Sequence, residues 1–207
     1  MSILVLTSNT LSSPAAAGQI EYESPIFAAT PIGTQRGIIP TQQYYRLNAD
    51  YAGSNATGAQ SLFGVGVTLS ASTVYEFEIE FLLSKTAGTT SHTVATGFGG
   101  TATINNILYE GFGSGGMSSI NATGNGTVVM VINTASATAV TGAQTAATNY
   151  VAWLLKGTVS INAGGTFIPQ YTLSAAPGGA YSTAAGSYIS INPLGASGAA
   201  INEGTWA

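Results

Sequence analysis

Three glutamates, Glu76, Glu78 and Glu80, form the most concentrated charge in the chain and are the first candidates for chemistry. Their spacing of two residues places the carboxylates on one face of a β-strand, about 7 Å apart. Carboxylates in such a row can share a divalent cation or raise one another's pKa. A solvated strand face that discourages edge-to-edge aggregation explains the same row, and we favour it over a metal site. Pairing with basic groups of a partner protein is a third explanation.

The single histidine, His92, is the next candidate for chemistry. Catalysis by histidine requires an organised nucleophile and a third group that orients the imidazole. The sequence contains no cysteine and no Gly-x-Ser-x-Gly motif that could supply the nucleophile. We therefore expect His92 to lie at a loop edge without a catalytic role, and we expect no enzymatic activity and no cofactor.

Only four residues are basic, among them Arg36 and Arg46. Each lies close in sequence to a carboxylate, Glu21, Glu23 or Asp50, so we expect structural ion pairs. Four cations cannot form a patch that reads phosphates, which argues against nucleic-acid binding. The glycine pairs lack the Gly-Lys-Ser or Gly-Lys-Thr that completes a phosphate loop, and we interpret them as tight turns.

Aromatic side chains offer faces on which sugars can stack. The candidates are Tyr44, Tyr45, Tyr109, Tyr150, Trp153, Tyr171, Tyr181, Tyr188 and Trp206. We interpret most of them as strand residues that pack a core. Tyr181 and Trp206 occupy loop or terminal positions in this interpretation, and they are the best candidates for contact with a host glycan.

The composition is poor in charge and rich in apolar residues. Of the 207 residues only 6% are charged, against roughly a quarter in ordinary soluble domains. Hydrophobic residues make up 45% and the net charge is −4, which gives little colloidal protection. No stretch of about twenty residues is apolar enough for a membrane-spanning helix. We therefore predict that much of the surface is covered in an oligomer or by a larger assembly.

Short strand signals bounded by turn residues run through the chain from residue 43 onward. The clearest is at residues 75–83, where apolar side chains alternate with the three glutamates, as in a half-buried antiparallel strand. Further strands are predicted at residues 44–47, 62–69, 93–98, 102–109, 127–133, 150–161, 167–173 and 188–191. The glycine-rich residues 111–116 are predicted as a loop. The pattern indicates an all-β, antiparallel, jelly-roll-like β-sandwich over residues 41–207.

The first forty residues differ from the rest. Apolar pieces at residues 3–7, 19–23 and 26–29 are separated by Pro and Gly, and residues 36–40 are predicted as a connector. Such pieces are too short to build a core within one chain, so residues 1–40 are expected to form an extended β arm that interlaces with neighbouring subunits. The expected interface residues are Ile3, Leu4, Val5, Leu6, Ile20, Tyr22, Ile26, Phe27 and Arg36.

Residues 12–22, Phe27 and residues 35–40 form an arrangement of aliphatic-Glu-Tyr, short turn, Phe and Arg-Gly-Ile. It is similar to the segment that precedes a globular head in tail-fibre-like chains, and residues 55–60 and 64–69 are similar to the β-rich head. The chain thus resembles phage virion structural proteins, particularly trimeric fibre and capsid-decoration proteins. The resemblance implies a homotrimer located on the virion, with the major capsid protein or other virion proteins as partners.

Two roles follow from the resemblance. The sequence has no long repetitive shaft, which favours a compact capsid decoration (cement) protein that stabilises the particle. The alternative is a tail-fibre or receptor-binding module that recognises host surface glycans. Neither role requires nucleic acid or a membrane as a partner.

Overall fold

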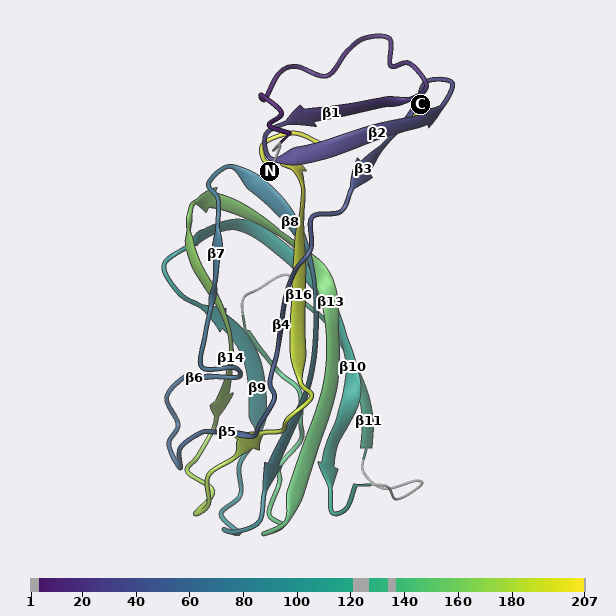
Figure 1. The fold of residues 1–207 in the computed structure, drawn as a ribbon. Helices are drawn as coiled ribbons and strands as arrows, with labels where there is room; N and C mark the ends of the chain where they lie inside the picture. The colour runs from purple at the N-terminus through teal and green to yellow at the C-terminus, as the bar shows by residue number, and fades with distance from the viewer. Residues whose placement is uncertain (1–3, 121–126, 134–136, 207) are drawn as a thin grey trace.

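Three strands near the N-terminus form a small sheet of their own. The computed structural model describes residues 4–120, 127–133 and 137–206 of the chain (Figure 1). The small sheet has the antiparallel order β1-β2-β3, from β1 (Gln19–Glu23), β2 (Ile26–Ile32) and β3 (Gln35–Ile39). It lies at one end of the molecule, beyond the ends of two larger sheets (Figure 1).

The largest sheet has eight strands. They are β4 (Gln43–Arg46), β5 (Tyr51–Ala52), β8 (Thr73–Lys85), β10 (Thr103–Met117), β11 (Thr127–Asn133), β13 (Asn149–Ala163), β15 (Ser182–Thr183) and β16 (Tyr188–Ala196). The long strands follow the order β11-β10-β13-β8, and β8 pairs on its other side with both β16 and β15. Strand β4 then pairs with β16, and β5 pairs with β15.

The third sheet covers one face of the large sheet. Its strands are β6 (Gln60–Ser61), β7 (Val67–Leu69), β9 (Val94–Gly99), β12 (Ala137–Ala139) and β14 (Gly165–Leu173). Aromatic rings from both sheets meet in the core, where the Phe77 ring of β8 lies 5.3 Å from that of Phe98 and 6.0 Å from that of Phe167. This contact of two apolar sheet faces holds the larger body together.

The predicted all-β, antiparallel class is confirmed, since every strand pairing among the described residues is antiparallel and the two packed sheets are consistent with a β-sandwich. The jelly-roll connectivity stays a prediction. The alternation predicted along residues 75–83 is also confirmed. Tyr75 and Phe77 are buried in the core, whereas Glu76 and Glu78 lie on the opposite face of β8.

The loop predicted at residues 111–116 is wrong, because these residues lie inside β10. Gly113 lies opposite Trp153 of β13. A Cβ at Gly113 would come within 2.2 Å of the Ala152 carbonyl oxygen and 2.7 Å of the Trp153 ring. Glycine is needed here because the buried indole occupies the space of a side chain, and no turn is involved.

Three further predictions about strand positions are wrong. The strand expected at residues 62–69 is reduced to β7, because the chain bends at Gly64, which has a φ of +72°. The connector expected at residues 36–40 is largely strand β3, because the chain reverses at Gly33 (φ +55°) and pairs back onto β2. Residues 4–7, expected to be strand-like, form no strand.

Candidate functional site

The register of the β1–β3 sheet gives it two chemically different faces. Side chains at paired positions of neighbouring strands point to the same side of a sheet. We call one side the covered face; it carries Gln19, Glu21, Glu23, Ile26, Ala28, Thr30, Arg36 and Ile38. We call the other side the open face; it carries Ile20, Tyr22, Phe27, Ala29, Gly37 and Ile39.

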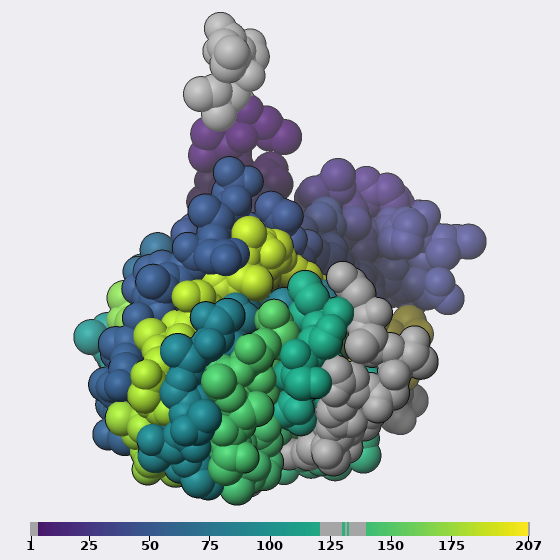
Figure 2. Space-filling model, turned by 90° about the horizontal axis from the view of Figure 1, so that it is seen from below, coloured from purple at the N-terminus to yellow at the C-terminus, as the bar shows by residue number. Residues whose placement is uncertain are grey.

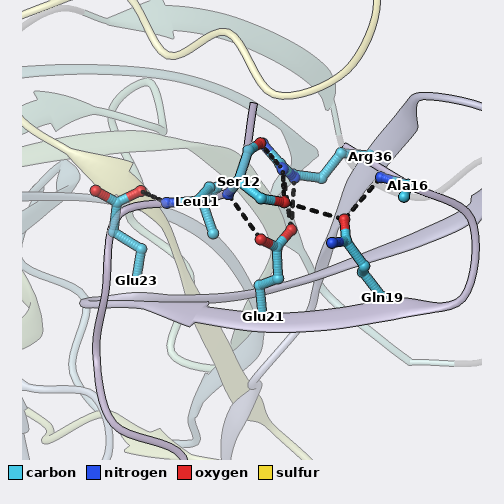
Figure 3. A network of polar contacts seen from close by, with 7 residues as sticks. All are labelled: Leu11, Ser12, Ala16, Gln19, Glu21, Glu23 and Arg36. Atoms are coloured by element: carbon cyan, nitrogen blue, oxygen red, sulfur yellow. Dashed lines mark hydrogen bonds and ion pairs between the residues drawn. The ribbon is translucent and has the colours of Figure 1, made fainter. Parts of the chain in front are cut away.

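The covered face is crossed by the N-terminal strap, which we define as residues 4–18 (Figure 3). Glu21 accepts a hydrogen bond from the Ser12 backbone N–H at 2.7 Å, and Gln19 accepts one from the Ala16 N–H at 2.7 Å. A longer bond of 3.4 Å runs from the Leu11 N–H to Glu23. Acceptor side chains at alternate positions of β1 thus satisfy backbone donors of the strap.

Arg36 joins β3 to both β1 and the strap (Figure 3). Its Nη2 lies 2.9 Å from Glu21 Oε2, its Nε donates to the same oxygen at 3.1 Å, and Nη2 also donates to the Ser12 carbonyl. The bonds from the Ser12 backbone and side chain, followed by the Arg36 charge, hold the pKa of Glu21 below its ordinary value. The predicted ion pair of Arg36 is therefore present. Arg46 forms no salt bridge within the described residues and donates instead to the Leu47 carbonyl.

The end of the chain reaches the same region. A Cβ placed on Gly204 would lie 3.6 Å from the Arg36 carbonyl oxygen, and the Trp206 indole N–H donates to the Glu203 carbonyl at 3.1 Å. Burial raises the pKa of Glu203, the Arg36 charge opposes this rise, and Glu23 adds to it. Most of the charged side chains at this end of the molecule therefore interact with the strap or with the C-terminal residues.

The open face is apolar and uncovered. The rings of Tyr22 and Phe27 stack at 4.6 Å with planes 24° apart, and Ile39 lies opposite Phe27 on β3. Ile20 is 64% exposed and Ile39 is 36% exposed. None of the open-face residues of this described sheet carries a charge. Tyr22, Phe27 and Ala29 are half-buried, and the described residues leave Ile20 and Ile39 exposed to water.

The predicted interface residues divide between the two faces. Ile20, Tyr22 and Phe27 lie on the open face, whereas the buried Ile26 and the ion-paired Arg36 lie on the covered face. The structure thus brings the first three together and separates them from the other two.

The remaining predicted interface residues belong to the strap. Leu4 and Val5 are exposed and Leu6 is half-buried. Figure 2 shows the start of the chain, in purple, projecting from the body of the molecule. Ile3 lies outside the described residues.

Three open-face residues, Ala29, Gly37 and Ile39, were not expected from the sequence. Gly37 and Ile39 lie at alternate, exposed positions of β3. They were missed because residues 36–40 were interpreted as a connector, and the alternation of a strand was therefore not applied to them.

The glutamate row lies on the outer surface of the large sheet. No group of three or more His, Cys, Asp or Glu side chains among the described residues is arranged to hold a metal ion. Glu78 accepts a hydrogen bond from the Tyr188 hydroxyl at 2.6 Å, and Lys156 Nζ lies 3.9 Å from Glu76 Oε1. These contacts favour a partly solvated charged surface over a cation site.

Tyr181 is buried, which corrects its expected place at a sugar-binding surface, and His92 lies two residues before β9, at the edge of a loop as predicted, and is buried as well. His92 Nε2 lies 2.9 Å from the Tyr181 hydroxyl, which also accepts a hydrogen bond from Asn149 at 2.7 Å. Burial raises the pKa of Tyr181 to about 12. Its ring cannot stack on a glycan because its hydroxyl is bound inside the sandwich. Trp206, at 78% exposed, keeps a free face.

Lys85 is a buried cation that the sequence did not single out. Its ammonium donates to the backbone carbonyls of Ala87, Gly88, Ala146 and Ala147. Burial lowers its pKa. These bonds join two loops at the end of the sandwich opposite the β1–β3 sheet (Figure 1), so we interpret Lys85 as a structural clamp.

The described residues contain no helix of the length and apolar character needed to cross a membrane. No family of protein sequences, no curated protein and no solved structure matches this chain.

Proposed function

We propose that this chain is a structural protein of a phage virion, a homotrimeric capsid decoration protein whose copies associate through the open face. The observation that carries the proposal is that the β1–β3 sheet has its charged face covered and its apolar face exposed. Its charged side chains are held beneath the strap, while Ile20 and Ile39 remain uncovered. An apolar surface of this kind gains about 25 cal/mol for each Å² that it buries.

The absence of charge on the open face makes it suitable for contact with a second copy of itself. Like charges placed against one another would oppose association, and the open face has none among its described residues. The Tyr22–Phe27 pair supplies a rigid aromatic surface, of the type enriched at interface centres. The trimeric state and the place on the capsid come from the resemblance to phage decoration proteins. The proposal assigns no catalytic activity to the chain.

The oligomeric role is tested by measuring the mass of the full-length protein in solution by mass photometry. We expect a species of three times the 20.8 kDa chain mass. Ile20→Lys places a charge on the open face and should give monomers. Val65→Lys is the control, because Val65 is exposed near β7 and lies outside the β1–β3 sheet. A monomeric wild type, or a trimeric Ile20→Lys protein, would contradict the proposal.

The place on the particle needs a separate measurement. A low-resolution image of the intact particle carrying labelled protein distinguishes the capsid surface from the tail. Label distributed over the capsid supports decoration, whereas label confined to the tail supports the fibre role.

One observation favours the receptor-binding alternative. A groove of about 250 Å³ opens between β4 and β7, lined by Tyr44, Tyr45, Val65, Val67 and Pro169 among others. Aromatic and apolar side chains of this kind can stack on sugars. A glycan array probed with wild type, Tyr45→Ala and Trp206→Ala tests this role. Binding that Tyr45→Ala abolishes would support it, and an array without binding would remove it.

A further inference from the structure

The exposed surface of the large sheet carries a second group of uncovered apolar side chains. Phe112 of β10 lies directly opposite Met130 of β11 on one side and Leu154 of β13 on the other. Phe112 is 60% exposed and Met130 is 68% exposed. Three neighbouring strands thus form an apolar row on the side of the sheet that faces away from the core.

The apolar row extends to neighbouring positions of the same surface. Ile132 of β11 is 71% exposed, and Leu108 of β10 is also exposed. The surface is hollowed on both sides of Glu110. One hollow of about 420 Å³ is lined by Leu108 and Ile132, and another of about 600 Å³ is lined by Phe112 and Leu154. Side chains of a partner can enter both hollows.

Carboxylates border this apolar row. Half of the eight acidic residues of the chain share the surface: Glu76, Glu78, Glu80 and Glu110. The pairing Glu110–Lys156–Glu78 crosses three strands, and Glu80 lies opposite Leu154. We call these nine residues, together with Lys156, the outer face: Leu108, Phe112, Met130, Ile132, Leu154 and the four glutamates.

The charge of the outer face is not balanced by the described residues of the chain. Lys156 lies 3.9 Å from Glu76, and both side chains are about half exposed. Glu80 and Glu110 form no salt bridge with any described residue. Arg46 of β4 lies opposite Tyr188, which lies opposite Glu80, and its guanidinium donates to the Leu47 carbonyl. Around the apolar row, four carboxylates therefore face one ammonium.

The negative charge of the outer face determines which kind of partner can bind there. A second copy placed on the outer face would bring carboxylates against carboxylates, and a nucleic acid or an anionic lipid surface would be repelled in the same way. A complementary surface presents apolar side chains with cations at its border, since such a surface buries the row and pairs the free carboxylates. We propose that the outer face binds a partner protein whose apolar side chains are bordered by lysine or arginine.

The probe for this proposal is a labelled peptide of alternating leucine and lysine, compared with a leucine–glutamate peptide of equal length. Binding to the full-length protein is followed by fluorescence anisotropy at low and high NaCl. We expect the leucine–lysine peptide to bind, more weakly at high salt, and the leucine–glutamate peptide not to bind. Equal binding of both peptides would overturn the proposal.

Variants locate the binding on the outer face. Phe112→Lys should weaken binding of the leucine–lysine peptide by about tenfold or more. Glu80→Gln combined with Glu110→Gln should weaken it less and flatten its salt dependence. Val65→Lys, at an exposed site near β7, is the control and should change nothing. Unchanged affinity in both outer-face variants would contradict the proposal.

This inference stands apart from the proposed trimer. Ile20→Lys should retain full affinity for the leucine–lysine peptide, because Ile20 lies on the β1–β3 sheet. If Ile20→Lys stays trimeric while Phe112→Lys loses peptide binding, the assembly role fails and the outer-face inference holds. The reverse result removes the inference and leaves the assembly role.

Discussion

The open face of the β1–β3 sheet and the outer face of the large sheet expose similar apolar side chains in opposite electrostatic settings. The row of Tyr22, Phe27 and Ile39 has no charged neighbour on its own face. The row of Phe112 and its neighbours is bordered by four glutamates. Burial of apolar area favours binding of a partner at both surfaces, whereas the surrounding charge determines which partner can bind at each.

The same sequence pattern produces both settings. Glu21 and Glu23 alternate with apolar residues in β1, as Glu76 and Glu78 do in β8. In β1 the carboxylates turn toward the strap and bind its backbone N–H groups. In β8 the apolar side chains turn toward the second sheet, which leaves the carboxylates outside. The layer that packs on each strand therefore decides whether its glutamates act within the chain or toward a partner.

The largest expected effect is on the free energy of unfolding, and it tests whether the two surfaces lie on equally tightly packed structure. Gly113→Ala should destabilise the sandwich beneath the outer face by about 1–3 kcal/mol, because its Cβ would meet the Ala152 carbonyl oxygen at 2.2 Å. Gly37→Ala on the open face should change stability by no more than about 0.5 kcal/mol, since nothing lies within 4 Å of its added Cβ. Urea unfolding of both variants measures the difference. Equal losses would mean that the two surfaces rest on similarly packed structure.

A smaller effect tests whether charge separates the two surfaces. Lys156→Gln removes the one ammonium among the carboxylates of the outer face. Affinity for the leucine–lysine peptide should rise by no more than about fivefold, while the oligomeric state stays that of wild type. Anisotropy and mass photometry on the same preparation measure both. A change of oligomeric state would show that the outer face takes part in self-association.

The smallest effect concerns how firmly the covered face is held, and it depends on pH. The pKa of Glu21 is lowered on folding, so its contribution to stability is present above its ordinary value of 4.5 and is lost as the pH falls through the folded pKa. The pKa of Glu203 is raised by burial, so its carboxylate opposes the folded arrangement as the pH rises through and above 4.5.

Two variants of opposite sign test this pH dependence. At pH 6, Glu21→Gln should increase amide hydrogen exchange in the strap, and Glu203→Gln should decrease exchange near the chain end. Both differences from wild type should shrink as the pH falls below about 4.5, after correction for intrinsic exchange rates. Differences that persist unchanged at low pH would show that ionisation of these carboxylates has no part in holding the two segments.

Fold class and the faces of individual strands could be predicted from the sequence, because the alternation of β8 is local and uninterrupted. The course of β10 could not be. Its glycines are typical of a turn when met in a sequence, and their requirement comes from Trp153, which is forty residues away from Gly113 and lies beside it only in the sheet. The burial of Tyr181 escaped prediction for a similar reason, since its partners His92 and Asn149 are distant in sequence.

Within β1, the sequence by itself determined that Ile20 and Tyr22 share one face and Glu21 and Glu23 the other, because the period of two is a local property of an extended chain. Only the tertiary structure decided which face is covered. The strap reaches the glutamate side through Ser12, which meets Arg36 across 24 residues of sequence. No local pattern encodes that meeting, since the contact depends on the path of the intervening chain. Its consequence is that the strap leaves uncovered the face that carries Ile20, Tyr22 and Phe27.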